Sequence, residues 1–272
     1  MTNSTLPRNK QQVASQFNRA AHTYDNAARI QQLSADELAQ RLQTIQDTEQ
    51  SSITGNWLDL GCGTGFSVPT LIQQGAQYVI GADLAHTMCL TSKEKLAELP
   101  FHSVTCDAER LPFSNHSFDG IYSNLMIQWS EQLEDLFYEA LRVLKSDGVF
   151  AFATLGPKTM LELKSAWQQV DPFTHVNTFD NKDSLVALCE QFFDIESIHQ
   201  QAVTQQHSSL KSLLKELKAI GATNVNSGRR PGLGGRERIK KLEQAYRQQS
   251  ESDYLPLTYD LIWIVARKRS DA

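Results

Sequence analysis

Apolar and polar residues alternate along the middle of the chain in a pattern that predicts strands and helices in regular succession. Short apolar runs rich in β-branched and aromatic residues have the length and composition of buried strands. Between them, apolar residues recur at the spacing of one helix face. The predicted strands are Trp57–Leu60, Tyr78–Ala82, Phe101–Thr105, Phe118–Ser123 and Val149–Thr154, and the predicted helices span 64–74, 86–98 and 131–144. Strands that alternate with helices indicate a parallel sheet with helices on both faces.

The segments on either side of this core show longer helical stretches and fewer strands. The pattern predicts helices from Lys10 and over Ala27–Gln43, a turn-rich linker at 47–55, helices at 159–170 and 180–193, a strand at Ile195–Val203, two helices within 209–249, and a last strand at Leu257–Arg267. We therefore expect an α/β fold with a doubly wound, seven-stranded, mostly parallel sheet of the Rossmann-like type. The expected parts are an N-terminal helical lid (1–49), a ligand-binding core (50–208), a helical lid insertion (209–250) and a closing strand with the tail (251–272).

The residues that follow the first predicted strand form a glycine-rich turn. From Leu58 to Gly65 the chain reads Leu-Asp-Leu-Gly-Cys-Gly-Thr-Gly, with three glycines on alternate positions. Glycine lets a backbone turn sharply and approach a ligand without a Cβ in the way. Dinucleotide folds use Gly-x-Gly-x-x-Gly, whose third glycine would fall at Phe66. The spacing therefore favours S-adenosylmethionine over NAD.

An acidic residue lies at or after the end of each of the first three predicted strands. These residues are Asp59, Asp83 and Asp107. Open α/β sheets bind ligands at the carboxyl ends of their strands, where one carboxylate can accept from ribose hydroxyls and another from an adenine amino group. Any one of them alone is typical of a solvated loop acid. Three on successive strands beside a glycine turn predict a nucleoside-binding site.

The core resembles the class I S-adenosylmethionine-dependent methyltransferases. Leu111-Pro112-Phe113 followed by Ser117-Phe118-Asp119 is similar to the run that precedes the fourth strand in that superfamily. The cofactor-binding residues that we assign with this resemblance are Asp59, Gly61, Gly63, Gly65, Asp83, Met88, Asp107, Ala108, Asn124 and Gln128. The resemblance implies that the glycines back the methionine moiety, Asp83 holds the ribose, and Asp107 with its neighbour brackets the adenine. Met88 would pack on the adenine ring, or else belong to the core.

Further runs resemble the malonyl-acyl-carrier-protein O-methyltransferases of biotin synthesis. They are Phe17-Asn18-Arg19-Ala20-Ala21-His22-Thr23-Tyr24-Asp25, Ser123-Asn124-Leu125-Met126-Ile127-Gln128-Trp129, Trp167 with Val170-Asp171, Leu217-Lys218-Ala219-Ile220-Gly221-Ala222-Thr223, and Pro256-Leu257-Thr258-Tyr259. The similarity extends over about residues 12–268. It implies methyl transfer from S-adenosylmethionine to the free carboxylate of a malonyl thioester on acyl carrier protein. The generic core motifs alone would not separate this family from quinone or sterol methyltransferases.

Such an acceptor needs no general base, because a carboxylic acid with a pKa of about 4 is already ionised at neutral pH. We expect in-line positioning and the exclusion of water to supply the catalysis. For contact with the acceptor we predict Tyr24, whose ring would close the pocket, together with His175 and Asn177, which would donate to the carboxylate or the thioester carbonyl. The alternatives are a core role for Tyr24 and a surface position for His175.

Composition limits the cellular compartment and the classes of partner that we expect. The formal charge of −5 argues against a nucleic-acid footprint over the whole molecule. Four scattered cysteines, with no Cys-x-x-Cys pair, indicate a reducing compartment and no metal site. The N-terminal segment has no apolar signal region, and no apolar run has the length of a membrane span. We therefore expect a cytoplasmic protein that uses neither a membrane nor nucleic acid.

One segment is basic, although the chain as a whole carries a net negative charge. Residues 229–247 contain seven basic residues against two acidic ones. A basic patch on an acidic protein predicts an acidic partner, here the acyl carrier protein, unless the segment is simply a solvated helix. The competing functions are methylation of a quinone or fatty-acid acceptor, and a cofactor-binding module without catalysis.

Overall fold

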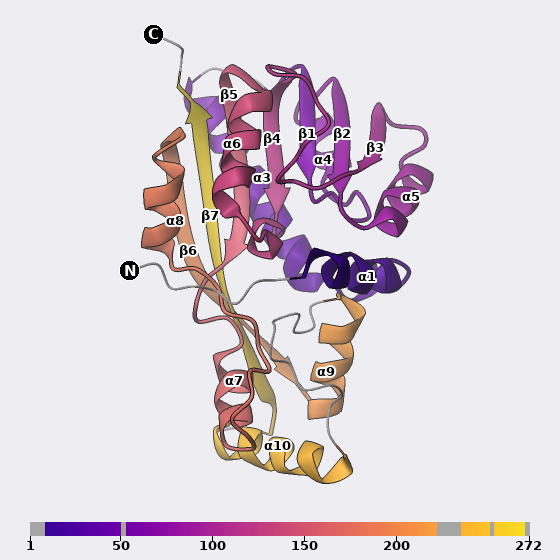
Figure 1. The fold of residues 1–272 in the computed structure, drawn as a ribbon, viewed down its shortest axis with the longest axis vertical. Helices are drawn as coiled ribbons and strands as arrows, with labels where there is room; N and C mark the ends of the chain where they lie inside the picture. The colour runs from indigo at the N-terminus through magenta and orange to yellow at the C-terminus, as the bar shows by residue number, and fades with distance from the viewer. Residues whose placement is uncertain (1–8, 50–52, 222–234, 251–252, 270–272) are drawn as a thin grey trace.

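A seven-stranded sheet organises the computed structural model, which describes residues 9–49, 53–221, 235–250 and 253–269. The strands are β1 (Asn56–Leu60), β2 (Tyr78–Asp83), β3 (Phe101–Thr105), β4 (Phe118–Asn124), β5 (Leu144–Leu155), β6 (Phe193–His207) and β7 (Leu255–Lys268). Their order is β3-β2-β1-β4-β5-β7-β6 (Figure 1). The strands β1 to β5 pair in parallel, and β7 is antiparallel to both of its neighbours. The predicted doubly wound, mostly parallel sheet is confirmed.

Strand β1 is the point at which the order of the sheet reverses. It pairs with β2 on one side and with β4 on the other, so that the chain first winds outward to β3 and then crosses back. Open sheets of this kind have a crevice at the carboxyl ends of the strands beside the reversal. The fold therefore places the glycine turn, which follows β1, at the crevice.

Helices cover both faces of the sheet (Figure 1). The helices α3 (Arg29–Glu49) and α4 (Val68–Gln73) pack on one face, and α6 (Leu133–Val143) and α8 (Lys182–Cys189) on the other. Because side chains alternate across a strand, Trp57 joins the first core and its neighbour Leu58 joins the second. Full burial of such an apolar side chain contributes about 1.5–3 kcal/mol. The two cores fix the strand ends that form the crevice.

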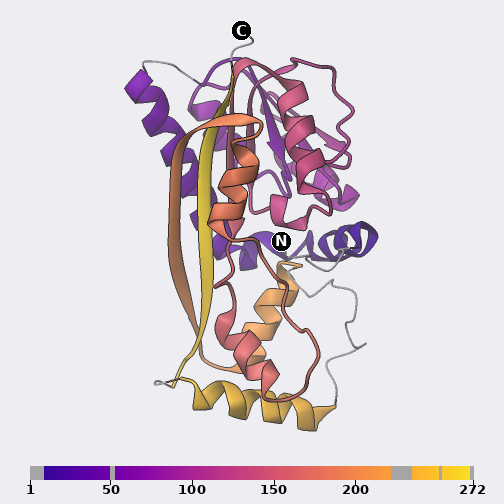
Figure 2. The same cartoon turned by 60° about the vertical axis from the view of Figure 1, so that its left-hand side comes forward.

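Strands β6 and β7 continue beyond the sheet as a two-stranded ribbon (Figures 1 and 2). β5 pairs with β7 only from Leu261 to Arg267, whereas β6 pairs along β7 from Leu255 to Lys268. The ribbon carries α7 (Leu161–Gln168), α9 (Leu210–Ala219) and α10 (Arg236–Gln248). Their buried side chains belong to the same core as α3 and α4.

Helices α1 (Lys10–Ala20) and α2 (Tyr24–Ala27), which we call the lid helices, lie across the carboxyl edge of the sheet. The side chain of Asn9 caps α1 by accepting from the Gln12 backbone N–H at 3.0 Å. Helix α5 (His86–Lys95) lies beside β2 and β3 and contacts α1. Among the described residues, none of the helices has the length and apolar character of a membrane span.

Some predicted boundaries were wrong. Helix α3 continues to Glu49 because no glycine or proline interrupts the first part of the predicted linker at 47–55. The helix predicted from residue 64 begins only at Val68, since Gly65 has a φ of +80°, which a right-handed helix does not contain.

Candidate functional site

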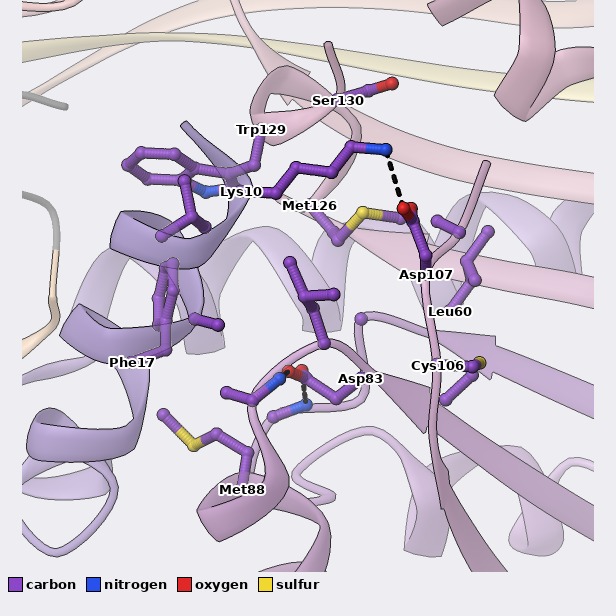
Figure 3. A pocket seen from close by; sticks show the side chains of 18 of the residues that line it. Lys10, Phe17, Leu60, Asp83, Met88, Cys106, Asp107, Met126, Trp129 and Ser130 are labelled. Carbon is purple, nitrogen blue, oxygen red and sulfur yellow. Dashed lines mark hydrogen bonds and ion pairs between the residues drawn. The ribbon is translucent and has the colours of Figure 1, made fainter. Parts of the chain in front are cut away.

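A cavity lies at the carboxyl ends of β1 to β4, beneath the lid helices (Figure 3). It is lined by the glycine turn, by the loops that follow β2, β3 and β4, and by one side of the lid helices. The lining residues are Lys10, Val13, Ala14, Phe17, Tyr24, Leu60, Gly61, Gly63, Ala82, Asp83, Leu84, Ala85, Met88, Cys106, Asp107, Ala108, Glu109, Asn124, Leu125, Met126, Trp129 and Ser130. A cavity at the order reversal of an open sheet is the position at which such folds bind nucleotides.

The glycine turn combines folding and binding requirements. All three glycines have positive φ, and a Cβ at Gly61 or Gly65 would collide with Met126 or Leu96 respectively. A Cβ at Gly63, whose φ is +52°, would meet no protein atom within 4 Å. Gly63 lines the cavity, so the space that a side chain would fill is open to a ligand.

Asp83 joins the glycine turn to the start of α5 while facing the cavity (Figure 3). Its carboxylate accepts from the backbone N–H of Gly63 at 3.0 Å and from that of Ala85 at 2.7 Å. Burial raises the pKa of Asp83, and these two hydrogen bonds oppose the rise. Since each carboxylate oxygen has a second acceptor position, Asp83 can also accept from the hydroxyls of a ligand.

Asp107 is held by a residue that the sequence did not indicate. Its carboxylate accepts from the Lys10 ammonium at 2.7 Å (Figure 3) and from the Glu109 backbone N–H at 3.0 Å. Lys10 also pairs with Glu109, which accepts from the Ser130 hydroxyl at 2.6 Å. A lysine at the start of a polar helix carries no sequence signal for a distant acid, so only the fold reveals this contact.

The structure brings part of the predicted cofactor set together at the cavity. The predicted residues that line it are Gly61, Gly63, Asp83, Met88, Asp107, Ala108 and Asn124, and those that do not are Asp59, Gly65 and Gln128. The amide of Gln128 donates to the Leu125 carbonyl at 2.6 Å and accepts from the Thr154 hydroxyl at 3.2 Å. The nitrogen and the oxygen of the Gln128 amide therefore each form a hydrogen bond within the protein.

Asp59 lies beneath the cavity in β1 rather than on its wall. It is only 2% exposed, and its Oδ2 has no hydrogen-bond partner among the described residues. Burial, with a smaller effect from the negative charge of Asp83, raises the pKa of Asp59 to about 7. Burial disfavours the charged form of a carboxylic acid, and a neighbouring anion adds to the effect.

Of the three predicted acceptor-binding residues, Tyr24 lines the cavity and the other two do not. His175 Nε2 lies 2.8 Å from Asp171 Oδ1, and its ring stacks on Trp167 of α7 at 3.7 Å. The Oδ1 of Asn177 is buried without a partner among the described residues. His175 and Asn177 therefore do not share the cavity with Tyr24; they lie in the loop after α7, where the His175 ring packs on Trp167.

Phe17 brings three of the family-like runs together. Its ring lines the cavity and lies 6.3 Å from that of Tyr24 and 5.4 Å from that of Trp129, edge to face in the second case. A Cβ at Gly221, at the end of α9, would lie 3.2 Å from Phe17. Residues that are far apart in the sequence therefore meet on the lid side of one cavity.

Hydrogen bonds and an ion pair connect the lid helices to the residues that follow each of β1, β2 and β3. Asp25 accepts from the Thr64 hydroxyl in the glycine turn at 2.5 Å, and Asn18 accepts from the Thr87 backbone N–H after β2 at 2.8 Å. Lys10 makes the third contact, to Asp107 after β3. A ligand in the cavity would thus be enclosed by the lid.

Comparisons with known proteins agree with this geometry. Residues 58–152 match a family model described as a methyltransferase domain. The solved structure of the YcgJ protein from Bacillus subtilis shares the fold, with a TM-score of 0.62, 19% identity, and coverage of 87% of this chain and all of that one. The crystal structure of the BH2331 protein from Bacillus halodurans gives a TM-score of 0.59 at 16% identity, covering 79% of this chain and 93% of that one.

Curated relatives are more similar in sequence. The malonyl-[acyl-carrier protein] O-methyltransferase of Laribacter hongkongensis is 35% identical over 93% of this chain and 88% of its own length. The biotin biosynthesis bifunctional protein BioHC of Teredinibacter turnerae is 37% identical over 98% of this chain but 48% of its own length. This chain spans about half the length of the bifunctional relatives that it matches.

The sheet order, the glycine turn and the cavity at the strand ends define a class I methyltransferase fold. Within that class, the chain belongs to the family of the malonyl-[acyl-carrier protein] O-methyltransferases.

Proposed function

We propose that this chain transfers a methyl group from S-adenosylmethionine to the free carboxylate of malonyl-acyl carrier protein, for biotin synthesis. The observation that carries the proposal is the meeting of the family-like runs at Phe17, on the same cavity that contains Gly63 and Asp83. The relatives with the corresponding names support the acceptor. The names of the bifunctional relatives support the pathway.

The residues of the cavity fit the cofactor. Asp83 has acceptor positions for ribose hydroxyls, Asp107 lines the cavity and would accept from an adenine amino group, and the open space at Gly63 would receive the methionine moiety. Met88 is buried beside the cavity and offers an apolar surface to the adenine ring. S-adenosylmethionine would supply an electrophilic methyl group on its sulfonium.

The contribution of this chain is to position and enclose the acceptor. Burial, with smaller effects from Asp83 and Asp25, raises the pKa of Tyr24, so its hydroxyl stays protonated at neutral pH. A protonated phenol donates a hydrogen bond and can orient the acceptor carboxylate. The lid helices exclude water, which strengthens electrostatic interactions in the site. No proton has to leave the acceptor, because its carboxylate is already ionised.

The proposed partner is the acyl carrier protein, an acidic protein that would be attracted to basic side chains. Of the predicted docking region at 229–247, Arg229 and Arg230 lie outside the described residues. Within α10, Arg238 pairs with Asp171, whereas Arg236 and Lys240 are exposed. These two exposed side chains are available to attract an acidic partner.

The test is to incubate purified protein with S-adenosylmethionine and malonyl-acyl carrier protein, and to follow the acyl arm by mass spectrometry. We expect a mass gain of one methyl group and one S-adenosylhomocysteine for each ester formed. Acetyl carrier protein, which has no free carboxylate, is the control and should stay unchanged. Succinyl and glutaryl carrier proteins measure chain-length selection. Methylation of a quinone precursor in place of the malonyl thioester would refute the proposal.

A further inference from the structure

Helix α9 presents a row of lysines to solvent. Lys211, Lys215 and Lys218 stand four and three positions apart, a spacing that puts them on one helix face, and all three are exposed. The opposite face is apolar and buried, through Leu210, Leu213 and Leu217. The helix is therefore held by one face, and its charged face is available for contact.

The spacing of this row opposes the stability of the helix, apart from the position of Lys218 in the last turn, where a positive charge is favourable. Like charges at the (i, i+4) and (i, i+3) positions destabilise a helix by a few tenths of a kcal/mol. Within the part of the chain that the structure describes, no carboxylate forms an ion pair with these lysines. The acid on the same helix, Glu216, instead lies 3.8 Å from His207.

Several basic side chains of α10, unlike the lysines of α9, form ion pairs within the protein. Arg238 pairs with Asp171 and its guanidinium lies over the Trp167 ring at 5.8 Å. Lys241 and Arg247 lie 3.9 and 3.2 Å from glutamates one turn earlier on α10. A partner that docked on α10 would compete with carboxylates at Arg238, Lys241 and Arg247. The other two basic residues of α10, Arg236 and Lys240, are exposed without an ion pair among the described residues, whereas on α9 all three lysines are in that state.

Helix α9 also leads to the cavity. The Thr23 hydroxyl, between the lid helices, donates to the Ala219 carbonyl at 3.1 Å. Two residues further on, Gly221 lies against Phe17, whose ring lines the cavity. In both views α9 ends beside the lid helices, whereas α10 crosses the far end of the ribbon (Figures 1 and 2).

We propose that the lysine row of α9 is the main docking surface for the acidic carrier domain that bears the thioester. The inference rests on the proposed function and assigns its protein partner to a particular helix. A thioester on an arm of limited length reaches the cavity more readily from a helix that ends at Phe17 than from one at the far end of the ribbon. The row would steer an acidic partner through long-range attraction.

The experiment compares two charge-reversal triples on the full chain. One is Lys211→Glu, Lys215→Glu and Lys218→Glu on α9, and the matched control is Arg236→Glu, Lys240→Glu and Lys241→Glu on α10. Each variant is assayed with malonyl-acyl carrier protein and with malonyl-coenzyme A, at low and high salt. Circular dichroism and calorimetric titration with S-adenosylmethionine show whether the fold and the cofactor site are intact.

We expect the α9 triple to raise KM for the carrier-bound substrate by about tenfold or more, and the α10 triple by about threefold or less. The effect should shrink at high salt, because salt screens exposed charges. Turnover of the coenzyme A thioester should stay within about twofold of wild type for both triples. An unchanged KM in the α9 triple, or a larger rise in the α10 triple, would overturn the docking assignment and leave the proposed function standing. Failure of the wild-type chain to methylate either malonyl thioester would refute the function itself.

Discussion

The Thr64 hydroxyl in the glycine turn donates a hydrogen bond of 2.5 Å to the carboxylate of Asp25 in the lid. The second oxygen of Asp25 accepts from the Lys95 ammonium at 2.6 Å. Thr64 is 1% exposed, so this contact is shielded from water at one end. Asp25 directly follows Tyr24, which lines the cavity. The contact therefore connects the position of Tyr24 to the loop that would hold the cofactor.

Removal of this contact should weaken cofactor binding and turnover together. A hydrogen bond to a charged group contributes about 1.5–3 kcal/mol, so we expect Asp25→Ala and Thr64→Val each to lower kcat/KM for S-adenosylmethionine about tenfold or more. The double variant should be no worse than the poorer single one, since both changes break one interaction. Lys95→Met is the control, and its exposed ion pair should matter about twofold at most. Steady-state kinetics on all four variants test this prediction. It is contradicted if the losses of kcat/KM in the two single variants add up in the double variant.

Two glycine substitutions in the same turn should have different effects. Gly63→Ala adds a methyl group that meets no protein atom, so we expect a melting temperature within a few degrees of wild type and a loss of S-adenosylmethionine binding of about tenfold or more. Gly65→Ala would place a Cβ 2.4 Å from Leu96 Cδ1 and should mainly lower the melting temperature. Calorimetric titration and thermal melts separate the two effects. Equal melting temperatures for the two variants would refute the distinction.

The buried Asp59 should make stability depend on pH. Because its pKa is raised to about 7 in the folded protein from about 4 in the unfolded chain, the folded state binds more protons between these values. The free energy of unfolding contributed by this group is therefore greatest at low pH and falls as the pH rises through 7. We expect Asp59→Asn to lose less stability than wild type between pH 5 and pH 8. Urea unfolding at both pH values measures this change. If the free energy of unfolding changes equally with pH in the variant and the wild type, the shifted pKa is excluded.

We expect His175 to contribute to packing and not to catalysis. Its ring stacks on Trp167 and bonds to Asp171, which also holds Arg238. We expect His175→Ala to lower the melting temperature by several degrees while kcat stays within about threefold of wild type, because stacked aromatic pairs contribute about 0.5–1.5 kcal/mol to stability. Tyr24→Phe should show the reverse pattern, with lower kcat and little change in melting. Lost turnover in His175→Ala at an unchanged melting temperature would restore the catalytic role predicted from the sequence.

The sequence by itself determined the sheet and half of the site. Strand patterns depend on local alternation of apolar and polar residues, and the acids at strand ends follow from chain order. Asp83 and Asp107 could therefore be placed at the same edge of the sheet as Gly63 from the sequence alone. The motifs were equally local, and they indicated the family to which the chain belongs.

Only the tertiary structure decided which distant residues meet. The contact of Lys10 with Asp107, that of Asp25 with Thr64, and the position of Gly221 against Phe17 join segments whose separation in the sequence says nothing of their distance in space. The same holds for His175, whose position in a loop is compatible with a role in the site. Only the structure shows that its ring packs on Trp167 of α7 and does not line the cavity. Local sequence specifies secondary structure and strand-end chemistry, whereas the packing of whole elements decides which side chains share a cavity.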